Sequence, residues 1–303
     1  MILSVDIGGT AVKLGLVDKQ GVVHARQEAS TCYDGYRTPV LTTVIREARA
    51  FLAHMGETVE GAGVSATGQI DTETGVVAGT NGKIPNYEGA RIKEDMEAAL
   101  GLPVWPLNDA DAAALGECFA GRGRGFDPVL MITLGTGVGG GIILGGRVYG
   151  GLRGFAGELG HFTLYQEGPL CPCGKRGCFE HYASTSALVR RAKEFTGEML
   201  NGREIFARAA GGDAALRWVL EQWIEDIAAG ITGLVHIFQP QMVLIGGGVS
   251  AQEELLVTPL RERVLRGVMP RFAEGLHLEA AALGNDAGLV GAARYFMERQ
   301  AAY

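Results

Sequence analysis

The feature that most limits the possible folds of this 303-residue chain is a segment that occurs twice. Ile2–Val5 is a short apolar strand, Asp6–Thr10 (DIGGT) is a glycine turn, and Ala11–Val17 reads as a second strand. The pattern returns near the middle of the chain, with strand Val129–Thr133, the turn LGTGVGGG and strand Ile142–Leu144. An internal repeat of this kind predicts two similar α/β domains that face each other, each offering one phosphate loop.

The glycine turns have the composition of phosphate-binding loops. Glycine lets backbone N–H groups approach an anion closely, and Thr10 and Lys13 add donors to the first turn. For one such segment alone, a plain hairpin turn is the simpler interpretation. A third cluster, Gly246–Gly248, follows the strand Gln241–Ile245 and precedes a predicted helix that Ser250 is placed to cap. Three glycine turns after three apolar strands favour a nucleotide cleft.

Composition and charge argue against several classes of protein. The net charge of −7 and the lack of a basic run disfavour a nucleic-acid surface, which needs clustered Lys and Arg. No charge-free apolar stretch of about 18 residues occurs, so a membrane span is not expected. Met1 is followed at once by a strand and not by a signal peptide, and three of the five cysteines are clustered. We therefore expect a cytoplasmic protein with reduced thiols.

A candidate catalytic carboxylate follows a buried strand in the first half of the chain. The strand Pro103–Leu107 ends at Asn108-Asp109, and a helix follows. Open α/β sheets bind ligands at the carboxyl ends of their parallel strands, which makes Asp109 a candidate for chemistry. Asn108 and Asp109 are also both suited to cap the helix. The local sequence leaves the two interpretations of Asp109 open.

The stretch Glu158–Glu180 (ELGHFTLYQEGPLCPCGKRGCFE) combines metal-ligating residues with carboxylates. One histidine and three cysteines match the ligand set of a tetrahedral zinc site: His161, Cys171, Cys173 and Cys178. A disulfide or buried thiols are the alternatives, but the stretch is too polar for a core. A structural zinc leaves the glutamates at both ends unexplained.

Together these motifs resemble the ROK family (repressor, open reading frame, kinase), whose bacterial sugar kinases belong to the actin-like ATPase superfamily. The resemblance runs over essentially the whole chain, and the family order is kept. The motifs are DIGGT at 6–10, NDA at 108–110, GTGVGGG at 135–141, ExGH at 158–161 and CxCGxxGCxE at 171–180. The resemblance implies two actin-like (ribonuclease H-like) α/β domains with an interdomain cleft that closes on sugar and ATP.

The resemblance also implies how the chain divides into domains. Residues 1–117 with the C-terminal helix 287–303 would form the N-terminal α/β domain. Residues 118–286 would form the C-terminal α/β domain, which carries the zinc loop and the dimer surface. The protein is accordingly expected to be a homodimer.

Carried over to this chain, the family pattern assigns roles to its motif residues. Asp109 resembles the general base that accepts the proton of the attacking sugar hydroxyl. The sugar would be bound by Asn86, Asn108, Asp109, Glu158, His161 and Glu180. The nucleotide would be bound by Gly8, Gly9, Thr10, Lys13, Thr136, Gly137 and Gly247, with Asp6 holding Mg²⁺ through water. His161 would bind the structural Zn²⁺ with one nitrogen and face the sugar with the other.

Two positions depart from the family pattern, and one residue competes for the metal. The usual proline in the loop after the third strand is Thr67, and the loop around Asn86 lacks the tryptophan often found shortly after the asparagine. Both lie near the expected sugar site, so the identity of the sugar is left open. His181 is an alternative zinc ligand, and we prefer His161 because it belongs to the ExGH motif.

We therefore expect an ATP-dependent hexose kinase that converts glucose to glucose 6-phosphate. The alternatives are a kinase for N-acetylmannosamine or N-acetylglucosamine, or for another sugar such as fructose, allose or a β-glucoside. A sugar-responsive transcriptional regulator is disfavoured. In this family a helix-turn-helix precedes the first phosphate loop, and five residues precede Asp6 in this sequence.

Overall fold

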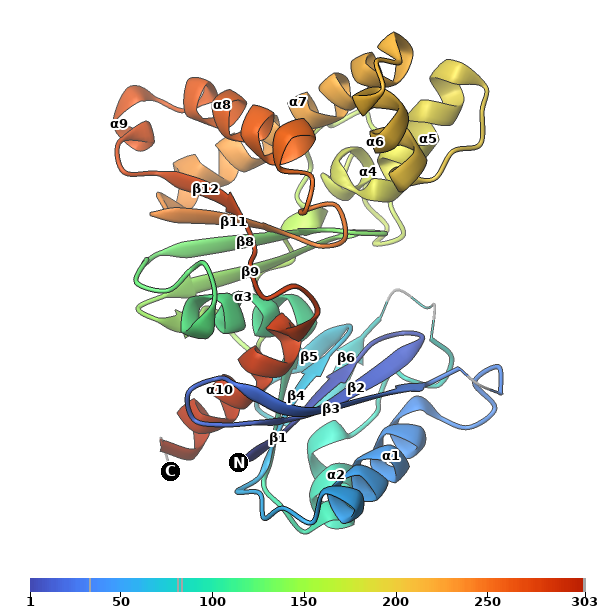
Figure 1. The fold of residues 1–303 in the computed structure, drawn as a ribbon, viewed down its shortest axis with the longest axis vertical. Helices are drawn as coiled ribbons and strands as arrows, with labels where there is room; N and C mark the ends of the chain where they lie inside the picture. Colours follow the sequence, from blue (N-terminus) through green and yellow to red (C-terminus); the bar gives the residue numbers. More distant parts are fainter. Residues whose placement is uncertain (33, 81, 83, 302–303) are drawn as a thin grey trace.

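The computed structural model describes residues 1–32, 34–80, 82 and 84–301. Figure 1 shows two five-stranded sheets, one above the other, with helices α3 (Asp109–Ala120) and α10 (Ala287–Ala301) between them. Further helices cover the outer face of each sheet. The predicted α/β class is confirmed. Within the described residues, no helix combines the length and the apolar character needed to cross a bilayer.

The first sheet is built from the N-terminal part of the chain in the order β3-β2-β1-β4-β7. β1, β2 and β3 are antiparallel neighbours, whereas β4 and β7 run parallel to β1. A separate hairpin of β5 and β6 follows β4. The bounds are β1 (Ile2–Ile7), β2 (Ala11–Val17), β3 (Val23–Ser30), β4 (Ala62–Ala66), β5 (Gln69–Asp71), β6 (Val76–Gly79) and β7 (Val104–Asn108).

The second sheet repeats the topology of the first. Its order is β10-β9-β8-β11-β12, again with two antiparallel pairs followed by two parallel pairs. The bounds are β8 (Val129–Leu134), β9 (Val138–Leu144), β10 (Arg147–Val148), β11 (Met242–Gly246) and β12 (His277–Ala280). The duplicated strand–turn–strand segment therefore opens two sheets of the same topology, as the internal repeat predicts.

The outer helices differ in number between the two halves. The first sheet is covered by α1 (Val40–Met55) and α2 (Ile92–Leu100), as Figure 1 shows. The second half carries α4 (Glu180–Ala183), α5 (Thr185–Thr196), α6 (Gly202–Ala210), α7 (Ala214–Phe238), α8 (Thr258–Gly267) and α9 (Pro270–Ala273). Short helical turns occur at Leu159–His161, Glu253–Val257 and Gly284–Asp286.

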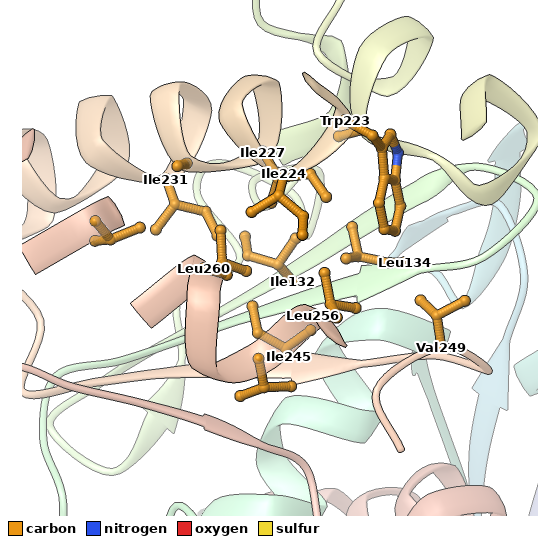
Figure 2. Packing of buried hydrophobic residues seen from close by; sticks show 14 of the residues in the cluster. Ile132, Leu134, Trp223, Ile224, Ile227, Ile231, Ile245, Val249, Leu256 and Leu260 are labelled. Atoms are coloured by element: carbon orange, nitrogen blue, oxygen red, sulfur yellow. The ribbon is translucent and has the colours of Figure 1, made fainter. Parts of the chain in front are cut away.

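The core of the second half is organised around α7. Asp213 caps this helix by accepting hydrogen bonds from the amides of Ala215 and Leu216. Figure 2 shows that the apolar face of α7 packs over β8 and β11 together with the segment that leads into α8. The labelled side chains are Ile132, Leu134, Trp223, Ile224, Ile227, Ile231, Ile245, Val249, Leu256 and Leu260. Burying a side chain of this size contributes about 1.5–3 kcal/mol, so this face holds the outer helix on the sheet.

A separate apolar cluster joins the two sheets through α3 and α10. It contains Ile2 and Trp105 from the first sheet, Met131 and Met242 from the second, and Phe296 from α10. Both sheets contribute to this cluster: α10 packs on strands of the first sheet and on α3, and α3 packs on β8 and β9 of the second sheet. The domain boundaries at residues 117–118 and 286–287 stay a prediction.

Glycines let α3 and α10 approach each other to backbone contact. A Cβ placed on Gly291 of α10 would lie 1.7 Å from the carbonyl oxygen of Ala112 in α3. A Cβ on Gly63 of β4 would lie 1.9 Å from the carbonyl oxygen of Ala292. Neither neighbour is a movable side chain, so only glycine fits at these two positions.

We predict that Gly291→Ala lowers the free energy of unfolding by about 1–3 kcal/mol, because the new methyl group overpacks a backbone contact. The matched control is Gly233→Ala in α7, where an added Cβ meets no atom within 4 Å. The control should gain about 0.5–1 kcal/mol, because alanine is the better helix former. Denaturant unfolding measures both. Equal stability of the two variants would contradict the close-contact argument.

Candidate active site

The first glycine turn, Gly8–Thr10, joins β1 to β2 and is held from outside the hairpin. The amide of Gly8 donates to the carbonyl of Ala11 at 2.9 Å, which closes the turn. The carbonyl oxygen of Gly9 accepts hydrogen bonds from the hydroxyls of Thr31 at 3.0 Å and Tyr36 at 2.9 Å. These bonds fix the direction of the peptide groups in the turn, which a phosphate-binding loop requires.

Asp6 lies near the end of β1, two residues before this turn. Its Oδ1 accepts the hydroxyl of Ser65 at 2.7 Å, and Lys13 Nζ lies 3.4 Å from its Oδ2. A Cβ on Gly288 would lie 3.1 Å from the carboxyl group, so the start of α10 backs Asp6 closely. Lys13 therefore pairs with Asp6, the residue opposite it on the neighbouring strand β1.

The second glycine turn occupies the equivalent place between β8 and β9. The amide of Thr185 donates to the carbonyl of Gly135 at 2.8 Å, and the hydroxyl of Ser186 donates to the carbonyl of Thr136 at 2.8 Å. The start of α5 therefore braces this turn as Thr31 and Tyr36 brace the first.

Glu180 also contacts the second turn. Its Oε2 accepts the amide of Val138 at 2.9 Å, and a Cβ on Gly137 would lie 2.3 Å from the same oxygen. The structure therefore places this predicted sugar ligand between the cysteine-rich loop and the glycine turn. One carboxylate connects two parts of the site that the sequence separates.

The third glycine turn follows β11, next to the second. Gly247 has a φ of +89°, and a Cβ there would lie 2.3 Å from the carbonyl oxygen of Leu134, so glycine is required. The prediction that Ser250 caps a helix is wrong. Its hydroxyl donates to the carbonyl of Gly247 at 2.8 Å, and the following helical segment starts at Glu253. Ser250 instead closes the glycine turn on itself.

The structure decides between the two possible caps of α3. Asn108 is the N-cap: its Oδ1 accepts the amides of Ala110 at 2.8 Å and Asp111 at 3.3 Å. Its Nδ2 donates to the carbonyl of Gly68 at 2.9 Å, which ties α3 to the entrance of the β5–β6 hairpin. Asp109 Oδ1 accepts the Ala110 amide at 2.9 Å. Asp109 Oδ2 takes no part in capping the helix.

Asp109 has the properties of a base that works near neutral pH. Burial and the nearby carboxylate of Asp6 raise its pKa to about 6, and the more distant Glu158 acts in the same direction. The amide of Ala110 and the hydroxyl of Thr67 hydrogen-bond to the carboxylate and lower its pKa, so they oppose the rise. The cleft thus brings together three predicted site residues, Asp6, Asp109 and Glu158.

Sequence reasoning missed three residues beside Asp109. In the sequence, Thr67 stands out only as a departure from the family's proline; in the structure its hydroxyl hydrogen-bonds to Asp109. Asp111 is buried, and burial together with the charges of Asp109 and Glu158 raises its pKa well above the usual range. Tyr87 is also buried, and burial together with Asp109 and Asp6 raises the pKa of its phenol. An aromatic residue directly after Asn86, within a polar loop, was the available signal for Tyr87.

Asn86 lies on the loop between β6 and α2. It is exposed and has a φ of +56°, a conformation that asparagine tolerates better than most residues. The neighbouring Tyr87 anchors the loop in the first core. The structure places Asn86 on the same loop as predicted and records no contact between it and the other candidate sugar ligands.

The four predicted zinc ligands come together. The ligand atoms of His161, Cys171, Cys173 and Cys178 all lie within 4.8 Å of one another. His161 Nδ1 is 3.7 Å from Cys171 Sγ, while its Nε2 is 3.9 Å from Glu158 Oε2. His181 is not a member of this cluster within the described residues. Three thiols and one imidazole nitrogen at this spacing fit a tetrahedral zinc ion.

Comparison with known proteins assigns the chain to a family. The family model described as ROK family matches residues 2–299. The chain belongs to the ROK family. It is 33% identical to the glucokinase of Thermotoga maritima, over 98% of both chains. It is also 33% identical to the beta-glucoside kinase of Listeria monocytogenes, over 99% of this chain and 98% of that one.

A solved structure supports the same assignment. The ROK family glucokinase of Streptomyces griseus, in complex with glucose and AMPPNP, matches with a TM-score of 0.82 and 34% identity. The match covers 97% of this chain and 98% of that chain. The fold is that of the actin-like ATPases, and this ROK member is an ATP-dependent sugar kinase.

We predict that Thr67→Val raises the pKa of Asp109 above its value of about 6 in the wild-type protein, because a hydrogen bond to the ionised form is lost. Carbon-13 NMR of the aspartate carboxyl groups measures it, with Asp109→Asn used to assign the signal. Thr67→Ser is the control and should keep the wild-type value. An unchanged or lower pKa in Thr67→Val would contradict the role given to the hydroxyl.

Proposed function

We propose that this ROK kinase transfers the γ-phosphoryl group of ATP to a hydroxyl of a hexose, converting glucose to glucose 6-phosphate. The observation that carries the proposal is Asp109, a carboxylate with a pKa raised to about 6 at the start of α3, in electrostatic contact with Asp6 beside the first glycine turn. The glucokinase relatives that match almost the full chain support glucose as the acceptor.

Asp109 acts as the general base in this proposal. It accepts the proton of the attacking sugar hydroxyl as that oxygen bonds to the γ-phosphorus and the bond to the β-phosphate oxygen breaks. Because phosphoryl transfer depends mainly on positioning and charge stabilisation, one base and well-placed donors suffice. A pKa of about 6 keeps the carboxylate ionised at neutral pH while leaving it basic enough to take the proton.

The nucleotide is bound in this proposal by the three glycine turns. Gly8, Gly9 and Thr10 on one side and Thr136 and Gly137 on the other surround the phosphates, with Gly247 near the adenosine. Asp6 holds Mg²⁺ through water, and Lys13 balances the charge of Asp6 from 3.4 Å. Mg²⁺ supplies charge neutralisation for the phosphates when it is bound.

The sugar ligands in this proposal come from both halves of the chain. Asn86 and Asn108 belong to the first half, and Glu158, His161 and Glu180 to the second. Carboxylate and amide groups suit vicinal hydroxyls, because an analogue that lacks a hydroxyl leaves one of them unpaired. A sugar bound between the halves therefore favours their approach.

Zinc acts as a structural brace in this proposal. His161, Cys171, Cys173 and Cys178 hold it, and it supplies a fixed point for the loop between Glu158 and Glu180. The support is the orientation of His161, whose Nδ1 lies toward Cys171 and whose Nε2 lies toward Glu158. A cytoplasmic homodimer stays a prediction from the family resemblance.

A β-glucoside kinase is the second candidate function. The observation that favours it is the beta-glucoside kinase of Listeria monocytogenes. Its identity to this chain and the share of the chains covered are as high as for the Thermotoga maritima glucokinase. The departures at Thr67 and after Asn86 both belong to segments that would lie near the sugar in this proposal. The acceptor therefore needs a direct assay.

The assay is ADP release from Mg-ATP with glucose, mannose, fructose, allose, N-acetylglucosamine, N-acetylmannosamine or a β-glucoside, each tested alone. We expect a clear preference for glucose. Asp109→Asn should lower kcat by about 100- to 10,000-fold while sugar affinity, measured by calorimetry, is kept. A preference for another sugar would show that glucose is not the acceptor. Near-wild-type turnover of Asp109→Asn would show that Asp109 is not the general base.

We predict that Cys173→Ser releases zinc and weakens sugar binding together, because His161 belongs to both sites. Metal content by atomic emission and glucose affinity by calorimetry are the two measurements. His181→Ala is the control and should retain both. Loss of metal with full sugar affinity would show that the brace is not needed for the sugar site.

A further inference from the structure

Arg153 connects the two halves of the chain beside the site. It lies on the loop between β10 and Leu159–His161, which belongs to the second half. Its guanidinium forms an ion pair with Asp71 at the end of β5, in the first half. Its carbonyl oxygen accepts the amide of Thr72 at 3.0 Å. Side chain and backbone of one residue therefore reach across to the same turn.

The turn that receives Arg153 is built to hold a charged carboxylate. Asp71 Oδ1 accepts the amides of Glu73 at 3.0 Å and Thr74 at 3.1 Å, which leaves Oδ2 for the arginine. The side chain of Asp71 is 3% exposed and that of Arg153 is 49% exposed. Burial alone raises the pKa of Asp71, but the two amides and Arg153 outweigh it and lower the pKa. The carboxylate is thus ionised, and Arg153 of the other half compensates its charge.

The next residue brings the two backbones into contact. Gly154 has a φ of +91°, and a Cβ there would lie 2.6 Å from Thr72 Cγ2 and 2.8 Å from the carbonyl oxygen of Ile70. The ion pair, the Thr72 hydrogen bond and this close approach together make up what we call the Arg153 contact.

The loop between Gly150 and Gly157 links Arg153 to Glu158 along the chain. The amides of Gly154 and Ala156 both donate to the carbonyl of Gly150, at 2.9 and 3.1 Å, so the loop is folded on itself. At its far end, a Cβ on Gly157 would lie 3.0 Å from the carbonyl oxygen of Gly140 in β9. The loop is therefore held at both ends, and Glu158 follows it directly.

The β5–β6 hairpin is bonded to the other side of the site as well. The carbonyl of Gly68, just before β5, accepts the side chain of Asn108, the N-cap of α3 and neighbour of Asp109. One hairpin thus contacts Asn108 through Gly68 and the Glu158 loop through Asp71 and Thr72. The two groups of sugar ligands, which lie on different halves of the chain, share this support.

We propose that Arg153 is a positioning residue for the sugar: the Arg153 contact sets the place of Glu158 relative to Asn108 and Asp109. The proposal rests on the proposed function, because it takes Glu158 and Asn108 as sugar ligands. It gives Asp71 and Arg153 a role in sugar affinity although neither belongs to the predicted sugar site.

The test compares Arg153→Met with wild type and with Arg203→Met, a matched control on α6 of the same half. We expect Arg153→Met to raise KM for glucose by about 10- to 100-fold, because a misplacement of about 1 Å far from the mutated residue can cost up to about 100-fold. KM for ATP and zinc content should stay unchanged. Arg153→Lys keeps the positive charge but not the planar guanidinium group with its several donors. It should therefore bind glucose more tightly than Arg153→Met and less tightly than wild type.

A second variant separates positioning from the instability that an unpaired buried carboxylate causes. Asp71→Asn removes the charge and keeps an oxygen for the turn amides. It should raise KM for glucose as Arg153→Met does, and the double variant should add nothing further, because both changes break one contact. Additive effects, or equal rises in KM for glucose and ATP, would overturn the proposal.

Hydrogen exchange tests the contact without any turnover. Residues 67–79 and 149–161 should both exchange faster in Arg153→Met than in wild type. Without the ion pair to Asp71, the loop is held to the hairpin more weakly, and the backbone hydrogen bond from the Thr72 amide to the carbonyl of residue 153 opens more often. Unchanged exchange in both segments would overturn the proposal whatever the kinetics. If wild-type protein neither binds nor phosphorylates glucose, the proposed function fails instead, and the exchange result still decides whether the contact holds.

Discussion

The geometry of the cleft depends on the backbone contact between α3 and α10. Gly291 lies against the carbonyl of Ala112, and α3 carries Asp109 at its first position. The start of α10 in turn packs on Asp6 through Gly288. Because the contact is between main chains and not between movable side chains, it places Asp109 and the carboxylate of Asp6 in β1 at a fixed separation. A side chain at Gly291 would change that separation directly.

Electrostatics explains why this fixed separation matters. Burial raises the pKa of Asp109 most, and the charges of Asp6 and Glu158 add to the rise. Asp111 is a further carboxyl group, whose pKa is raised by burial and by the charges of Asp109 and Glu158. Ser65, Thr67, Lys13 and backbone amides oppose this accumulation of negative charge. The balance leaves the pKa of Asp109 at about 6. A general base is most effective when its pKa is near the working pH. The pKa of Asp109 is thus set by burial and nearby carboxylates on one side and by hydrogen bonds on the other.

The two halves meet in contacts of different kinds. The cluster around α3 and α10 is apolar and buried, whereas the Arg153 contact is an ion pair and a hydrogen bond at the edge of the site. Apolar contacts have no preferred direction, whereas a paired carboxylate and guanidinium have a defined one. The polar contact is therefore the better suited of the two to align ligands that come from different halves.

Much of the architecture was readable in the sequence. The repeated strand–turn–strand segment predicted two sheets of the same topology, and the cysteine spacing predicted which four side chains gather. Both depend on local pattern: alternation and glycine content define a hairpin, and ligands within eighteen positions share a short loop. The choice of His161 over His181 also followed from its motif, and the structure gathers His161 with the cysteines.

Other features depended on contacts between distant segments. The sequence allowed Asn108, Asp109 or both to cap α3; in the structure Asn108 is the N-cap, and its amide nitrogen is held by the distant Gly68. It placed Ser250 at a helix start, but the hydroxyl turned back to Gly247. Thr67, Tyr87 and Asp111 interact with Asp109 only in the folded structure, where different segments are brought together.

The sequence by itself therefore determined the elements, the repeat and the chemistry that each motif can supply, because these follow from neighbours along the chain. Only the tertiary structure decided the pKa of Asp109, the bridge from Glu180 to Val138 and the pairing of Asp71 with Arg153. Each of these is set by burial and by charges brought from another part of the chain. Such effects act through space, and the order of residues does not encode them locally.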